Sequence, residues 1–139
     1  MKVHGACHCG FITFEAEADP AKASICHCTD CQASTGAAFR TNIPIPAKDF
    51  KLLSGQPTIY VKTTADSGNP REQAFCPKCG SPIYSTNPGP TKTAYMVRIG
   101  ILNERDQLPP QVQNWARSAQ KWLGDISGIR RNEKGAPPP

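Results

Sequence analysis

The stretch REQAFCPKCGSPIY, residues 71–84, contains a turn in which two residues separate Cys76 from Cys79. Pro77 fixes the backbone at the start of this turn and Gly80 permits the conformation that follows, so the two sulfurs converge. A C-x-x-C turn of this kind is typical of a structural zinc site, which takes four ligands. The missing ligands must come from another part of the chain, and their position decides how the chain folds.

A second cysteine pair lies near the N-terminus. Cys7 and Cys9 are two residues apart, and on an extended backbone residues i and i+2 point to the same side. Together with Cys76 and Cys79 they complete a four-cysteine site that pins the N-terminus to the middle of the chain. Because protein ligands fill all four positions, we expect the zinc of this site to be structural.

The remaining three cysteines lie in ICHCTDCQAS, residues 25–34. Catalytic zinc is commonly held by three protein ligands with an open fourth position, so Cys26, Cys28 and Cys31 are the candidate catalytic ligands. Spacing alone also permits the first two of these to join the C-x-x-C turn, which would strand the N-terminal pair. The more economical grouping predicts two zinc ions per chain.

Three histidines and one carboxylate lie close to these motifs. His8 and His27 each stand between two cysteines of an extended segment, so both should point away from the sulfurs. His4 lies near the N-terminal pair. We interpret the histidines as surface or packing residues, and Asp30 as a cap for the turn that contains it.

Composition limits the remaining function classes. Seven cysteines, an odd number, fit poorly with a closed disulfide framework. The formal charge of +5 falls to +2 once seven thiolates and two Zn²⁺ are counted, which argues against a nucleic-acid partner. No apolar run approaches the ~18 residues of a membrane span and no secretory signal is present. We therefore expect a cytoplasmic protein without a membrane partner; the sequence carries no signal for an oligomeric state.

Short apolar patterns predict a mainly β fold, in which a single zinc-stapled domain of short antiparallel sheets spans residues 1–127 and a flexible tail spans 128–139. One short helical segment is expected near the C-terminus, over 113–126. We interpret its Trp115 and Trp122 as residues of core or lid packing rather than as a stacking platform for a ligand. The segments expected to be strands or extended chain are 11–18, 36–45, 48–55, 58–64, 71–76 and 93–102.

The order of these motifs resembles the glutathione-dependent formaldehyde-activating enzyme family. The resemblance covers roughly residues 4–124 and is carried by GACHCG, CHCTDCQASTGAAF, LLSG, REQAFCPKCGSPIY, a strand ending in RIGIL, and W-x-R-S-x-x-x-W-L. It implies a β-tent arrangement of sheets. It also implies a structural zinc on Cys7, Cys9, Cys76 and Cys79 and a catalytic zinc on Cys26, Cys28 and Cys31.

The resemblance further implies a zinc-dependent carbon–sulfur lyase, similar to S-hydroxymethylglutathione synthase, that acts on a thiol adduct of a small aldehyde. Glutathione is then the expected co-substrate. The alternatives are a hydrolase or lyase for a different small thioether, thioester or aldehyde, and a non-enzymatic zinc-binding interaction module.

Substrate contacts are less clearly marked in the sequence. Arg71, Arg98 and Arg117 are candidates to bind a substrate carboxylate, because arginine binds one bidentately, although surface ion pairs are the more usual role. A histidine often found before the tryptophan in similar sequences is absent here, where Gln111 and Gln113 stand nearby.

Overall fold

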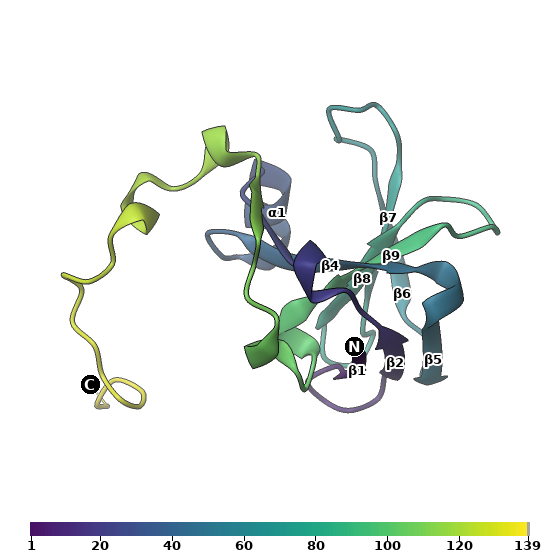
Figure 1. Ribbon diagram of the computed structural model, residues 1–139, viewed down its shortest axis with the longest axis horizontal. Coiled ribbons are helices and arrows are strands. Elements are labelled where there is room, and N and C mark those ends of the chain that lie inside the picture. Colours follow the sequence, from purple (N-terminus) through teal and green to yellow (C-terminus); the bar gives the residue numbers. More distant parts are fainter. Residues whose placement is uncertain (139) are drawn as a thin grey trace.

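The structure, a computed structural model, describes residues 1–138 and consists mainly of two β-sheets (Figure 1). The three-stranded sheet has the order β1-β2-β5 and contains β1 (Lys2–Ala6), β2 (Thr13–Glu17) and β5 (Phe50–Ser54). The seven-stranded sheet has the order β10-β3-β4-β9-β8-β7-β6 and contains β3 (Ser24–Cys26), β4 (Arg40–Pro46), β6 (Thr58–Lys62), β7 (Arg71–Phe75), β8 (Pro82–Thr86), β9 (Ala94–Arg98) and β10 (Val112–Asn114).

Helical structure is short. The α-helix is α1 (Thr29–Thr35), and the 3-10 helices are η1 (Pro20–Lys22), η2 (Ala47–Asp49), η3 (Ile99–Ile101), η4 (Arg105–Gln107), η5 (Ala116–Ser118) and η6 (Lys121–Gly124). The predicted mainly β fold class is therefore confirmed. Neighbouring strands pair antiparallel except β10, which lies parallel to β3.

The helical segment predicted over 113–126 takes a different form. Its first residues belong to β10, and the rest forms the two 3-10 helices η5 and η6. Trp122 is 53% exposed, so this segment has no buried apolar face to stabilise an α-helix. The α-helix α1 instead lies inside the second cysteine motif, where its N-cap is Cys28 and Gly36 closes it with φ 64°.

The strand predicted over 93–102 is also shorter than expected. β9 ends at Arg98, and the chain continues as the 3-10 helix η3, where Leu102 N donates to Ile99 O. Val97 and Ile99 are still buried. Apolar residues at alternate positions of this segment therefore indicated that Val97 and Ile99 are buried, but not the residue at which the strand ends.

Residues of both sheets form one hydrophobic core. Its largest fully buried side chains include Phe14 of β2, Ile43 and Ile45 of β4, and Val97 of β9. Phe50 of β5 joins the sheets, because its ring contacts the rings of Phe14, Tyr84 and Tyr95 with centroids 5.1, 5.5 and 4.5 Å away. The alternate residues of β4, Arg40 and Asn42, point to the opposite, polar face of the large sheet.

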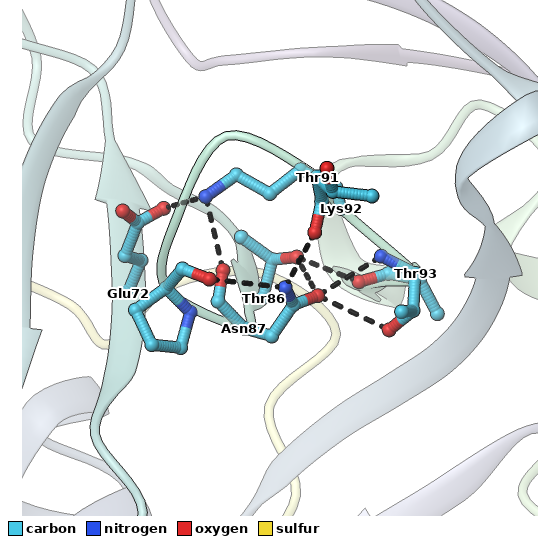
Figure 2. A network of polar contacts seen from close by, with 8 residues as sticks. Glu72, Thr86, Asn87, Thr91, Lys92 and Thr93 are labelled. Atoms are coloured by element: carbon cyan, nitrogen blue, oxygen red, sulfur yellow. Dashed lines mark hydrogen bonds and ion pairs between the residues drawn. The ribbon is translucent and has the colours of Figure 1, made fainter.

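The loop between β8 and β9 is organised by Asn87 (Figure 2). The side-chain amide of Asn87 donates to Thr91 O at 2.8 Å, and its Oδ1 accepts from Thr93 N at 3.0 Å. Lys92 pairs with Glu72 of β7. These bonds fix the loop against the neighbouring strand β7.

The chain beyond β10 leaves the sheets and ends far from the N-terminus (Figure 1). Within the described chain, residues 125–138 contain no strand or helix. The proposed boundary between a domain at 1–127 and a tail at 128–139 stays a prediction. Across residues 1–138, no helix has both the length and the apolar character needed to span a membrane.

Candidate metal centres and substrate cavity

Four cysteine sulfurs meet where the N-terminal hairpin lies against the β7–β8 turn. The Sγ atoms of Cys7, Cys9, Cys76 and Cys79 all lie within 4.8 Å of one another. Cys9 Sγ is 3.6 Å from Cys7 Sγ and 3.7 Å from Cys76 Sγ. Sulfurs about 2.3 Å from a tetrahedral zinc would be about 3.8 Å apart, whereas a disulfide requires about 2.05 Å. The cluster therefore has the dimensions of a four-thiolate metal site.

The backbone of each turn holds these sulfurs in place. Gly80 has φ 77°, a conformation that favours glycine, and its N–H donates to Cys76 O at 2.8 Å. The N–H groups of Ile12 and Lys78 donate to the sulfurs of Cys7 and Cys76 at 3.2 and 3.4 Å. The backbone of both turns therefore fixes the positions of these two sulfurs.

The other three cysteines form a separate cluster, at the junction of β3 and α1. Cys26 ends β3, Cys28 caps α1 and Cys31 lies in the first turn of that helix. Their Sγ atoms also lie within 4.8 Å of one another, and all three residues are half-buried. The structure thus separates the three from the C-x-x-C turn, and the alternative grouping left open by the sequence is not the observed one.

Hydrogen bonding divides the protons unevenly within this cluster. A hydrogen bond from Cys31 lowers the pKa of the Cys26 thiol. The same contact with Cys26, followed by burial, raises the pKa of Cys31. Three sulfurs so close together cannot all ionise without a cation between them. The cluster is therefore suited to a metal ion, which would remove this conflict.

The neighbouring histidines are not part of either cluster. His27 is buried, its Nε2 lies 2.7 Å from Gln113 Oε1, and its ring contacts Phe39. His8 is exposed, and the side chain of His4 pairs with Glu104. These positions agree with the expectation that the histidines point away from the sulfurs.

Asp30 has a role other than the predicted cap, since Cys28 Sγ caps α1 by accepting from Cys31 N at 3.2 Å. Asp30 Oδ2 instead contacts Lys62 Nζ at 2.9 Å and accepts from Thr64 Oγ1 at 2.8 Å. Lys62 and then Thr64 hold the pKa of the Asp30 carboxyl below its usual value. Asp30 therefore ties α1 to β6 across the polar face of the large sheet.

That polar face is the floor of a cavity of about 830 Å³. The three clustered cysteines lie in its wall, and the strands contribute Ser24, Asn42, Gln73, Ser85 and Met96 to its floor. The four-cysteine cluster does not line this cavity except through Gly80 of its turn. The four-cysteine cluster thus lies away from the cavity, with Cys9 exposed at the surface, whereas the three-cysteine cluster opens onto a space large enough for a small molecule.

The three arginines proposed as carboxylate ligands separate in the structure. Arg71 and Arg98 line the cavity. Arg117 lies outside it, where it is exposed, pairs with Asp66 at 3.7 Å and stacks on Trp115. Sequence reasoning missed Arg40, which lines the cavity and is only 7% exposed. One feature of the sequence could have indicated Arg40: it lies two residues before Asn42 on the same strand, and residues two apart share a face.

The two tryptophans are not core residues. Trp115 is 42% exposed, lines the cavity, and adopts φ 56°, the single positive φ of a non-glycine residue within 1–138. Strain of this kind is characteristic of ligand sites. Trp122 is exposed and does not line the cavity. Core packing is therefore wrong for both residues, whereas the place of Trp115 in the cavity wall agrees with packing as part of a lid.

These features define a class of protein: a small, mainly β domain with two cysteine clusters of metal-site dimensions, one of four sulfurs away from the cavity and one of three sulfurs in the cavity wall. The family model that matches residues 2–118 is that of the glutathione-dependent formaldehyde-activating enzyme. This chain belongs to that family.

Two relatives extend the comparison. The chain is 21% identical, over 126 residues, to a Halomonas elongata protein whose name provisionally makes it a glutathione-dependent formaldehyde-activating enzyme; the alignment covers 88% of this chain and 80% of that protein. It is also similar to the crystal structure of a Rhodobacter sphaeroides protein, with 25% identity and a TM-score of 0.59, over 82% of this chain and all of the other.

Proposed function

We propose that the chain is a zinc-dependent carbon–sulfur lyase that joins glutathione and formaldehyde into S-hydroxymethylglutathione. The observation that carries this proposal is the open cluster: three sulfurs within 4.8 Å of one another face a cavity, while the other four cysteines satisfy one another elsewhere. The name of the family, glutathione-dependent formaldehyde-activating enzyme, supports the same pair of substrates.

Cys7, Cys9, Cys76 and Cys79 would hold one zinc ion, and Cys26, Cys28 and Cys31 would hold a second. When bound, the second zinc supplies an acidified thiol and a polarised aldehyde oxygen. The chain itself supplies the three sulfurs, fixed by the end of β3 and the first turn of α1. Because those sulfurs line the cavity, a zinc ion held by them would be accessible to small molecules.

The proposed reaction is balanced without an oxidant or reductant. The thiol sulfur forms a bond to the aldehyde carbon, the carbonyl electron pair moves to oxygen, and the thiol proton ends on that oxygen. The residues of the cavity need only bind the thiol and bring the aldehyde to it. Trp115 stands in the cavity wall, where it can contact a bound substrate.

We expect the zinc-loaded protein to accelerate exchange between free formaldehyde and S-hydroxymethylglutathione at equilibrium. Two-dimensional exchange NMR with ¹³C-formaldehyde measures this rate directly, because free and bound carbon have different shifts. The control is the same protein after removal of metal by a chelator. Equal exchange rates with zinc-loaded protein and without protein would reject this substrate pair.

A further inference from the structure

Two buried arginines in the cavity have no acidic partner. Arg40 and Arg98 are each 7% exposed, and a charged side chain buried this deeply is normally paired with an opposite charge. Within residues 1–138, no carboxylate lies at salt-bridge distance from either one. Their positive charges are therefore not neutralised by acidic residues of the described chain.

The groups that hold these arginines are neutral oxygens. Arg98 donates to Asn42 Oδ1 at 2.6 Å, to Gln73 Oε1 at 2.7 Å and to Met96 O at 3.2 Å. Arg40 donates to the hydroxyl of Ser34 on α1. These bonds fix the orientation of each guanidinium and leave N–H groups free, since an arginine has five. Both Nε atoms are buried without a partner.

The sheet register brings the two arginines to the same place as the open cysteine cluster. Arg40 of β4 lies directly opposite Cys26 of β3, and Arg98 of β9 lies opposite Asn42, two residues further along β4. Residues two apart on a strand share a face. Both guanidinium groups therefore stand on the cavity floor, next to the three sulfurs.

The residues that line the cavity carry more positive than negative charge. One carboxylate, Asp30, stands against four cations, Arg40, Lys62, Arg71 and Arg98, and Asp30 is already paired with Lys62. Three thiolates and one Zn²⁺ would add a single negative charge. An excess of positive charge remains in a space partly shielded from water, where it attracts anions strongly.

We propose that Arg40 and Arg98 form a carboxylate-binding subsite that holds an acid group of the thiol substrate while its sulfur lies at the three cysteines. The inference rests on the proposed function for the thiol and adds the residues that hold a carboxylate of that thiol. Burial, followed by the charge of Arg40, lowers the pKa of Arg98 to about 9. That guanidinium is still protonated at neutral pH, and a bound carboxylate would stabilise its charged form.

The test uses Co²⁺-loaded protein and needs no turnover. The probes are mercaptoacetate, 3-mercaptopropionate and 4-mercaptobutyrate, each compared with its uncharged amide. Their binding is followed by the thiolate-to-cobalt absorption of the open site. We expect at least one acid to bind about tenfold or more tightly than its amide, since a charge-assisted contact is worth that much.

The Arg40→Gln and Arg98→Gln variants should each bring the affinities of that acid and its amide to within about threefold, because each loses part of the contact that gives the preference. Arg40→Gln is the safer variant, since within residues 1–138 the Arg40 side chain has a single hydrogen-bond partner, Ser34. Arg40→Lys should restore part of the preference, because lysine keeps the charge but not the planar fork. Arg117→Gln is the matched control outside the cavity and should bind like the unchanged protein.

Two results would overturn the subsite: equal affinity of each acid and its amide in the unchanged protein, or a preference that survives in Arg40→Gln and in Arg98→Gln. This outcome is separable from that of the proposed function. A protein that prefers the acids but does not accelerate formaldehyde exchange keeps the subsite and loses the substrate pair. A protein that accelerates exchange but binds each acid and its amide equally keeps the substrate pair and loses the subsite.

Discussion

The Cys76→Ser variant should lose its native fold at room temperature. Cys76 is fully buried, and its sulfur belongs to the cluster that joins the N-terminal hairpin to the β7–β8 turn. Structural zinc contributes about 10–16 kcal/mol of binding free energy in small domains. The whole stability of a domain is about 5–15 kcal/mol. Even a partial loss of that zinc affinity is therefore comparable with the total stability.

Urea denaturation followed by near-ultraviolet circular dichroism measures this effect. The expected result is the absence of a cooperative transition, or a free energy of unfolding lower by at least about 3 kcal/mol. Cys28→Ser is the matched control, since it also removes one clustered cysteine but keeps an N-cap for α1. An unchanged urea midpoint in Cys76→Ser would show that the four-cysteine cluster does not stabilise the fold.

The same Cys28→Ser variant should keep the fold and lose the activity. Cys28 is half-buried beside the cavity, and its Sγ accepts from Cys31 N at 3.2 Å. Serine can accept this bond, so α1 should survive. The open site, however, is left with two sulfurs. Changes to residues that only orient metal ligands cost about 10–100-fold, so loss of a ligand should lower the formaldehyde exchange rate by at least about a hundredfold.

The exchange NMR measurement and a metal count by native mass spectrometry check this prediction together. We expect two zinc ions in the unchanged protein and one in Cys28→Ser. Thr29→Ala is the matched control, because Thr29 is the next residue, is exposed and does not line the cavity. A folded Cys28→Ser protein with full activity would remove the three cysteines from the mechanism.

Local spacing is enough to mark the three cysteine motifs, because one or two residues separate neighbouring cysteines within each motif. Spacing left the grouping of these motifs open, and the structure brings the first motif to the third. The strands β2, β4, β6 and β7 were similarly marked by alternation or by β-branched residues. The helix α1 was not predicted, since its seven residues have no apolar periodicity and its cap is a cysteine. The C-terminal segment was wrongly predicted as one helix, because helical spacing of Trp115 and Trp122 does not show whether a core is present to receive them.

The arginine subsite could not be predicted from spacing at all. Arg40 and Arg98 lie on strands far apart in the sequence, and only the antiparallel register of β3, β4 and β9 brings them to the cysteines. The sequence did single out Arg98, but together with Arg117, which lies outside the cavity. Convergence on one face of a sheet depends on the pairing of strands, and a single sequence does not specify that pairing.

Cadmium-113 NMR of the protein loaded with two cadmium ions tests the central claim most directly. The claim is that four cysteines close one metal site and three leave the other open to a thiol. We predict two resonances of equal intensity, of which only one moves when 3-mercaptopropionate is added, and that one should be lost in Cys28→Ser. A single resonance, or two resonances of which neither or both respond to the thiol, would contradict the account.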